Sequence, residues 1–194
     1  LVSYLHTQDN AMVTKIVHYY FGKAHAENED YQVQYQEIEG TIAPITTFLS
    51  KDISLVVTDS NLIFYSGLEK PEEIATIDLD GNIQSVAYDD ELVAVVLKNN
   101  VSSNYKLNIY NTRGKMLSSV TTEKEYANIK MEDGQVIMYD GPMCSIYMKN
   151  GTHKFEGKMD ENILEIFPDK GLNKYKVINA SSFNKVKLAM IGEK

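Results

Sequence analysis

The sequence repeats one octet four times, as ITTFLSKD (Ile45–Asp52), IQSVAYDD (Ile83–Asp90), YANIKMED (Tyr126–Asp133) and ILEIFPDK (Ile163–Lys170). The four copies align without gaps. Each has an apolar residue at its first and fourth positions and an acidic or lysine-bearing end. Their starts lie roughly 40 residues apart, which is the period of a β-propeller blade built from four short strands. The octet is therefore predicted to form the first, innermost strand of each blade.

A second phrase recurs in phase with the octets. Ile109–Gly114 (IYNTRG) matches Ile146–Gly151 (IYMKNG), and Leu62–Gly67 (LIFYSG) is a looser copy. Each copy is a short β-branched and aromatic run that ends in a glycine turn, which is typical of a strand and the hairpin after it. We expect this phrase to form the third strand of each blade.

The rest of the chain favours strands over helices. About eighteen short apolar or aromatic runs alternate with polar turns, and a helical period is almost absent. Several joints carry dipeptides that tolerate positive φ angles, namely Asp80–Gly81, Asp133–Gly134, Asp140–Gly141–Pro142 and Asn150–Gly151. The predicted fold class is all-β, a β-propeller-like repeat of four-stranded antiparallel blades connected by consecutive hairpins.

The repeat also predicts where the blades begin and end, within a single domain over residues 1–194. Complete blades are expected at about 41–79, 80–122 and 123–160. Residues 1–40 supply the second, third and fourth strands of a partial blade, and residues 161–194 supply the first three strands of another. We therefore expect the chain to be the C-terminal portion of a larger propeller. The alternative is an open or five-bladed assembly that is complete in itself.

Composition excludes several classes of protein. The 194 residues include 43% hydrophobic residues, enough for a core, and carry a formal net charge of −8. Nucleic-acid binding is disfavoured because it depends on Arg and Lys, and Arg113 is the only arginine. Cys144, the only cysteine, excludes an internal disulfide. Apolar runs such as Leu92–Leu97 have strand length and fall far short of the ~20 residues of a membrane helix.

Taken together, several segments resemble an uncharacterised domain-of-unknown-function family of clostridia and related Gram-positive bacteria. They include Pro44–Phe48, Phe64–Tyr65, Tyr105–Lys115, Tyr126–Ile129 and Asn173–Ile178. The resemblance covers nearly the whole chain, mostly at core and turn positions. It implies a propeller-like extracytoplasmic domain at the cell surface, anchored by a transmembrane helix upstream of this chain. It supplies no catalytic motif, and the Trp-Asp dipeptide of WD-repeat propellers is absent because the chain has no Trp.

Residue patterns for metal or nucleophilic chemistry are weak. His6, His18, His25 and His153 lack metal-ligand spacing, although His6 and His18 flank one predicted turn. No Ser lies in a Gly-x-Ser-x-Gly elbow. Asp78-x-Asp80-Gly81 departs from a calcium loop because its Gly follows the second Asp directly. We predict no metal site, no cofactor and no catalytic residue.

Asp52, Asp90, Asp133 and Asp169 are the candidate partner-binding residues, because they occupy equivalent places after the four predicted inner strands. In a propeller these turns lie on one face near the central channel, where acids would attract a cation or a basic partner. The alternative interpretation is that Asp simply suits turns and keeps them soluble.

Two functional hypotheses follow. The favoured one is a non-catalytic module that binds or scaffolds a protein or glycan partner at the cell surface. The alternative is a hydrolase or lyase that acts on cell-wall polysaccharide at the channel mouth, which would need a protonated carboxyl paired with an ionised one. The sequence assigns neither the identity of the partner nor the oligomeric state.

Overall fold

The computed structural model describes residues 1–8, 11–22, 31–39, 42–99, 101–189 and 191. These residues form eighteen strands and no helix, so the predicted all-β class is confirmed. No helix in the described part of the chain is long and apolar enough to cross a membrane. The chain divides into two compact units, one of residues 1–83 with 112–115 and the other of residues 84–111 with 116–194.

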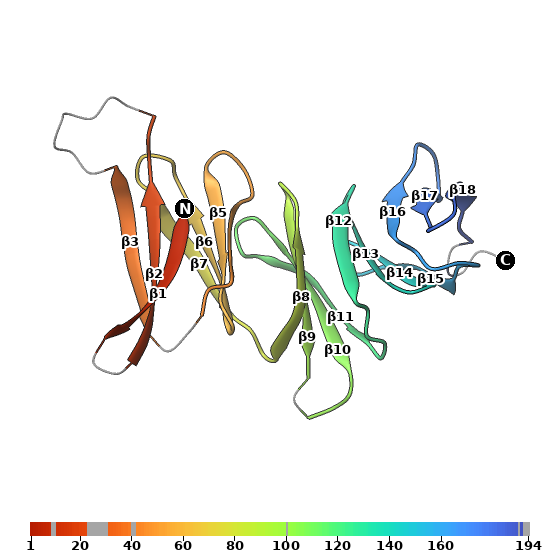
Figure 1. Cartoon of the computed structure of the whole chain (residues 1–194), viewed down its shortest axis with the longest axis horizontal. Helices are drawn as coiled ribbons and strands as arrows, with labels where there is room; N and C mark the ends of the chain where they lie inside the picture. Colours follow the sequence, from red (N-terminus) through yellow and green to blue (C-terminus); the bar gives the residue numbers. More distant parts are fainter. Residues whose placement is uncertain (9–10, 23–30, 40–41, 100, 190, 192–194) are drawn as a thin grey trace. The chain divides into compact units, whose positions relative to one another are not determined.

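The first unit contains two antiparallel sheets. One has the order β1 (Val2–Gln8), β2 (Ala11–Tyr19), β3 (Gln32–Glu39). The other has the order β4 (Ile45–Phe48), β5 (Ile53–Val57), β6 (Asn61–Ser66), β7 (Glu72–Asp78). Figure 1 shows that the strands of each sheet follow one another along the chain.

The second unit contains three further sheets, which repeat the same plan. The first is β8 (Asn82–Tyr88), β9 (Leu92–Lys98), β10 (Tyr105–Asn111) and β11 (Met116–Thr122). The second is β12 (Asn128–Glu132), β13 (Gln135–Asp140), β14 (Met143–Met148) and β15 (His153–Lys158). The third has only β16 (Glu165–Pro168), β17 (Lys174–Ile178) and β18 (Phe183–Lys187). As predicted, each octet supplies a first strand, namely β4, β8, β12 or β16.

The second repeated phrase supplies β6, β10 and β14, each the third strand of its sheet. In all three, the pairing with the fourth strand slips just before a tyrosine, at Tyr65, Tyr110 and Tyr147. The same slip precedes Tyr19 of β2 in its pairing with β3. A bulge at one equivalent place bends and twists the outer strand in the same way each time. Its presence in β2 indicates that β1, β2 and β3 correspond to the second, third and fourth strands of the repeat.

Turn geometry agrees with the sequence at Asp133–Gly134, where both residues have positive φ angles, 52° and 67°. These two residues join Glu132 to its cross-strand partner Gln135, as expected of a tight hairpin. Asp80–Gly81 differs, because it connects β7 to β8, which belong to different sheets. Gly81 has a φ of 141°, a conformation that glycine adopts easily, and it lies in a connection between two sheets rather than in a hairpin turn.

Within each unit, the core lies between the faces of successive sheets. In the second unit, alternate residues of β13 point to opposite sides: Val136 and Met138 pack with β9 and β10, whereas Ile137 and Tyr139 pack with β16 and β17. The middle strands are therefore buried on both faces, and for this reason their sequences are continuous apolar runs. Cys144 is fully buried in the second of these clusters, and burial raises the pKa of its thiol to about 12, so it packs there as a small apolar residue.

Candidate functional site: an acidic pocket on the first-strand turns

The four predicted acids occupy equivalent turns. Asp52 lies between β4 and β5, Asp90 between β8 and β9, Asp133 between β12 and β13, and Asp169 between β16 and β17. In each sheet this is the connection from the first to the second strand, as the octet alignment predicts. Their surroundings nevertheless differ, and Asp90 and Asp133 line one pocket in common.

Asp90 and Asp133 both line a pocket of about 360 Å³ in the second unit. We call it the acidic pocket, and its lining residues are Asp89, Asp90, Glu91, Asp133, Gly134, Met148 and Lys149. Four acidic residues and one lysine thus line the same pocket. A concave site with an excess of one charge focuses its field and attracts oppositely charged ligands.

Local backbone chemistry holds the acidic pocket in place. The Asp89 carboxylate accepts hydrogen bonds from the backbone N–H groups of Glu91 (2.9 Å) and Leu92 (2.8 Å), so it shapes the β8–β9 turn. The Lys149 N–H donates to the Gly134 carbonyl at 3.0 Å, which ties the β12–β13 turn to the end of β14. Asp90 lies in the β8–β9 turn and Asp133 in the β12–β13 turn, and these hydrogen bonds hold the two turns in place. Both residues line the acidic pocket.

Asp52 and Asp169 have other neighbours. Asp52 belongs to the first unit and accepts a hydrogen bond from the Ser50 hydroxyl at 3.2 Å. Asp169 lies beside Lys176 (3.3 Å) and Lys185 (3.9 Å). The Lys170 backbone N–H, together with these lysines, lowers the pKa of Asp169 below its usual range. A single partner-binding face formed by all four acids stays a prediction, and the structure brings Asp90 and Asp133 together.

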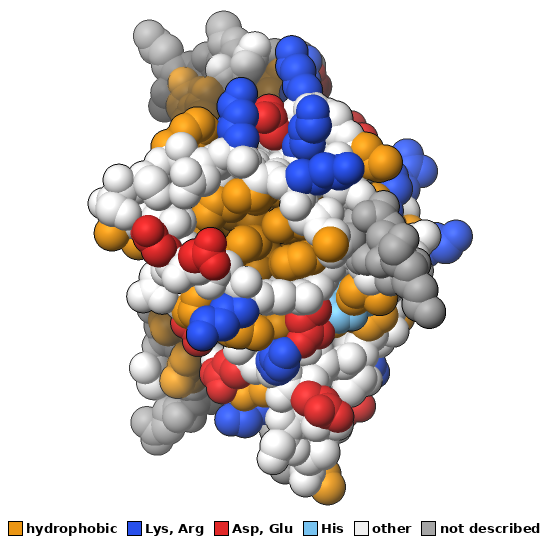
Figure 2. All heavy atoms as spheres, turned by 90° about the vertical axis from the view of Figure 1, so that its right-hand side faces the viewer, with side chains coloured by type: hydrophobic (Ala, Val, Ile, Leu, Met, Phe, Trp, Pro, Cys, Tyr) orange, Lys and Arg blue, Asp and Glu red, His pale blue; other side chains and the backbone are white. Residues whose placement is uncertain are grey.

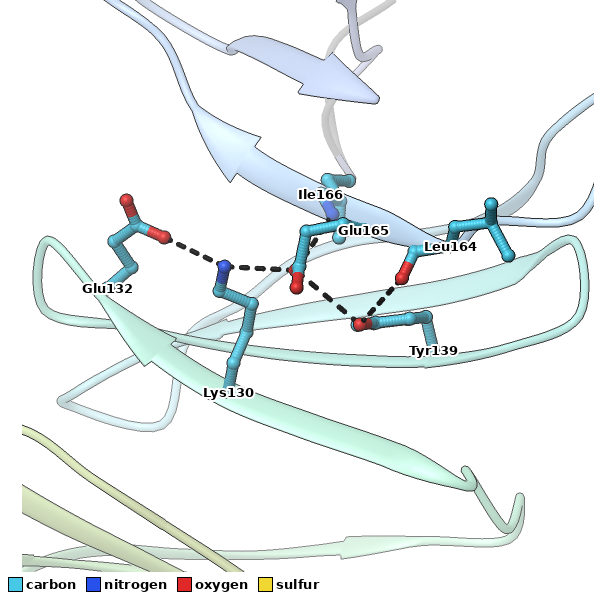
Figure 3. A network of polar contacts seen from close by, with 6 residues as sticks. All are labelled: Lys130, Glu132, Tyr139, Leu164, Glu165 and Ile166. Carbon is cyan, nitrogen blue, oxygen red and sulfur yellow. Dashed lines mark hydrogen bonds and ion pairs between the residues drawn. The ribbon is translucent and has the colours of Figure 1, made fainter. Parts of the chain in front are cut away.

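A polar network that the sequence did not indicate joins β12 to β16 (Figure 3). The Lys130 ammonium makes ion pairs of 3.0 Å with both Glu132 and Glu165, and it lies 3.9 Å from the centroid of the Phe167 ring. Tyr139 of β13 donates to the Glu165 carboxylate at 3.5 Å. Since Lys130 and Glu165 are far apart in sequence, this network fixes one sheet against the next.

We expect Lys130→Ala to lower the free energy of unfolding by about 1.5 kcal/mol, because it removes two partly buried ion pairs and a close cation–π contact. Urea unfolding monitored by circular dichroism measures the change. Lys70→Ala is the matched control, since its ion pair with Glu72 has a similar length, 2.9 Å, but both side chains are largely exposed. It should cost less than about 0.5 kcal/mol. Equal losses in the two variants would contradict the structural role of the network.

A histidine contacts a serine at two places in the structure, and His–Ser pairs also occur in enzymes that use serine as a nucleophile. His153 Nε2 lies 2.9 Å from Ser145 Oγ and 3.6 Å from a Glu156 carboxylate oxygen. Both partners contact the same ring nitrogen, whereas a catalytic triad uses one nitrogen for the serine and the other for the acid. Ser145 is also buried, with 1% of its surface exposed. The cluster thus packs β14 against β15 and lacks the geometry of a hydrolase.

The other contact joins His18 Nε2 to Ser54 Oγ at 2.8 Å, and each residue is only 2% exposed. His6 does not approach His18, because the β1–β2 register places it opposite Val13. His25 lies outside the described residues. Within the described ranges, no three His, Cys, Asp or Glu side chains are grouped so that they could hold a metal ion.

Comparisons with known proteins agree with the fold. The model of a family of unknown function, DUF5711, matches residues 1–188. No curated protein is significantly similar in sequence. Among solved structures, BBS1N in complex with ARL6DN is similar with a TM-score of 0.53 and 10% identity, over 93% of this chain and 62% of that one. A fragment of HIRA is similar with a TM-score of 0.50 and 14% identity, over 74% of this chain and 55% of that one.

These similarities show the fold alone: four-stranded antiparallel sheets of the β-propeller type. The chain spans only about three fifths of the length of the solved structures that it matches, 62% and 55%. At 10% and 14% identity, their partners and activities do not transfer to this chain.

Proposed function

The chain belongs to the DUF5711 family of unknown function, and we propose that it is a non-catalytic binding module whose acidic pocket docks a basic segment of a partner protein. The observation that carries this proposal is the acidic pocket itself, where carboxylates from two successive sheets line one concavity. Rigid turns that present charge at a fixed spacing suit recognition of a complementary surface.

A lysine or arginine side chain fits the chemistry of this pocket. Asp90, Glu91 and Asp133 offer carboxylates, while Met148 offers an apolar surface against which the stem of a long basic side chain can pack. Lys149, which also lines the pocket, would repel a partner that brings a second cation close to it. Charge-assisted hydrogen bonds to carboxylates are stronger than neutral ones, so a few such contacts can define the partner.

Photo-crosslinking from inside the acidic pocket tests this proposal. Met148 is replaced by a photo-reactive phenylalanine analogue, and the adduct formed in living cells is identified by mass spectrometry. The same crosslink is then measured in the double variant Asp90→Asn, Asp133→Asn. Asn is chosen because it tolerates the positive φ angle of 52° at position 133, so the turn is preserved.

We expect one predominant adduct, formed through a Lys- or Arg-rich segment, and at least a ~10-fold loss in the double variant, because both presented carboxylates become neutral. Asp52→Asn, in the equivalent turn of the first unit, is the matched control and should leave the yield unchanged. An adduct that forms equally well without the two carboxylates would show that binding does not depend on the acidic pocket. The absence of any adduct would contradict docking there.

The proposal places this module outside the cytoplasm, at the cell surface, and this part is supported by the family resemblance of its sequence. A protease added to intact cells should then degrade the domain while a cytoplasmic marker survives. Protection of the domain until the cells are lysed would refute an extracytoplasmic location without bearing on the acidic pocket.

A further inference from the structure

The last sheet of the second unit has one strand fewer than its neighbours. The sheets β8–β11 and β12–β15 each have four strands, whereas β16–β18 has three. Within the described residues, β18 pairs with β17 and its opposite edge has no strand partner. An edge of this kind presents backbone N–H and C=O groups that can pair with a further strand.

Hydrogen bonds near both ends of the hairpin show which backbone groups face this edge. The Leu188 N–H donates to the Asn173 carbonyl (3.0 Å), and the Asn179 N–H donates to the Ser182 carbonyl (2.9 Å). Antiparallel pairs alternate between hydrogen-bonded and non-hydrogen-bonded. The alternation therefore directs the N–H and C=O groups of Phe183, Lys185 and Lys187 away from β17, toward the open edge.

Four lysines gather on the same two strands. The register pairs Lys174 with Lys187 and Lys176 with Lys185, so all four lie on one face of the hairpin. Like charges directly opposite each other destabilise a sheet. Asp169 contacts Lys176 and Lys185, which offsets only part of this repulsion. We call these four residues the lysine square.

The lysine square stands out in a chain with a net charge of −8. Figure 2, which views the end of the chain that carries β16–β18, shows basic side chains gathered beside an apolar patch. Lys174, Lys185, Val186 and Lys187 also line a pocket of about 450 Å³ together with Asp169 and Lys170. Phe183 at the start of β18 is 59% exposed, so the edge offers apolar surface as well as charge.

We propose that the open edge of β18 binds an extended acidic segment of a partner protein as a fourth β-strand. In such β-augmentation, backbone hydrogen bonds supply affinity and alternate side chains supply specificity. Asp or Glu at every second position would face the lysine square, and the apolar residues between them would lie on the side of Val186. The lysines would repel a basic strand and disfavour an uncharged one, because a strand without acids leaves their repulsion uncompensated.

One fourth strand of the chain already carries several acids, although not at every second position. β7, the fourth strand of its sheet in the first unit, carries Glu72, Glu73 and Asp78. An acidic sequence is thus compatible with the fourth position of a sheet of this type. The proposed edge site uses residues of the sheet β16–β18 only, so it is independent of the acidic pocket and of the basic partner proposed for that pocket.

The test uses a fluorescent, end-capped heptapeptide of alternating Glu and Val as the probe, and its Lys–Val counterpart as the control. Binding to the whole chain is followed by fluorescence anisotropy. Two variants separate the charge from the strand pairing: Lys185→Ala and Lys185→Pro both lose the ammonium, but only the proline loses the outward N–H. Proline is tolerated on edge strands, and this N–H is not used in the pairing with β17.

We expect the Glu–Val peptide to bind and the Lys–Val peptide not to bind. Lys185→Ala should weaken binding about threefold, as for loss of one exposed charge. Lys185→Pro should weaken it by at least ~10-fold, since backbone pairing is lost as well. Lys158→Ala, at the end of β15, is a control that should leave the affinity unchanged. Equal affinities of the Ala and Pro variants would overturn strand addition and leave only a charged surface.

Amide hydrogen exchange on the unmodified chain gives a second measurement that needs no variant to fold. A bound strand should slow exchange at Lys185 and Lys187, whose N–H groups face the edge, by at least ~10-fold under saturating peptide. Asn184 and Val186 already bond to β17 and should change little. Uniform slowing across β18, or no slowing at Lys185 and Lys187, would contradict the proposal.

Discussion

Gly114→Ala should lower the free energy of unfolding by about 3 kcal/mol, because two independent costs meet at this residue. Gly114 has a φ of 75°, a left-handed conformation that L-residues adopt at a cost of about 1 kcal/mol. A Cβ added there would also lie 2.6 Å from the Ala75 Cβ of β7, far inside van der Waals contact. The turn of residues 112–115 belongs to the same unit as that strand and lies against it, so the chain has to shift or the turn has to open.

Gly134→Ala is the matched control, because it shares the first cost and lacks the second. Gly134 has a φ of 67°, and the nearest atom to its added Cβ is the Lys149 Cδ at 3.8 Å. It should therefore lose only about 1 kcal/mol. Urea unfolding of both variants, followed by circular dichroism at 218 nm, measures the difference. If both variants lost the same free energy of unfolding, the close approach of position 114 to Ala75 would contribute nothing to the loss of stability.

The repeat made most of this fold predictable from the sequence. The octets and the third-strand phrases mark equivalent strands because every blade buries apolar residues at the same positions of its strands. The glycine that ends each phrase has a positive φ angle at positions 67, 114 and 151. The bulge that precedes the tyrosines of these strands was not predicted. It appears only in the pairing with the fourth strand, and pairing register is not a local property of the sequence.

The candidate site was predictable only in part. The octet alignment placed Asp90 and Asp133 on equivalent turns, but their shared pocket depends on how two sheets pack. The surroundings of Asp169 could not be predicted from the octet alignment. The lysines that compensate it, Lys176 and Lys185, come from strands β17 and β18, and only the register of that hairpin places them beside it. For the same reason, neither the lysine square nor the pairing of Lys130 with Glu165 was apparent from spacing along the chain.

The stability of the domain should fall as the pH is lowered from 7.5 to 5.5, because His18 is buried in its neutral form. His18 Nδ1 donates to the Gln34 side-chain oxygen at 2.7 Å, since that oxygen can only accept. Its Nε2 is therefore free to accept from the Ser54 hydroxyl at 2.8 Å. The Tyr65 ring packs on the imidazole in a T-shaped arrangement, with the two ring centroids 4.8 Å apart. Burial lowers the pKa of His18 below its usual value of about 6.5.

The direction of the effect follows from proton linkage. In the unfolded chain His18 takes up its proton near its ordinary pKa of about 6.5, while in the folded chain it does so only at lower pH. Between these two pKa values the unfolded state binds more protons. Stability is therefore fully present above pH 6.5 and falls as the pH drops toward the folded pKa, by at most about 1.4 kcal/mol per pH unit for one group.

His18→Gln should remove this dependence, because glutamine can hydrogen-bond but does not titrate. At pH 7.5 the variant should be less stable than the unmodified chain by about 1–2 kcal/mol, since the fit to Gln34 and Ser54 is imperfect. At pH 5.5 the difference should narrow by about 1 kcal/mol. His6→Gln, at a more exposed position on β1, is the control and should keep the original slope. Urea unfolding at both pH values measures all three proteins. If His18→Gln kept the full acid slope, another group would carry the dependence and neutral His18 would not be required for folding.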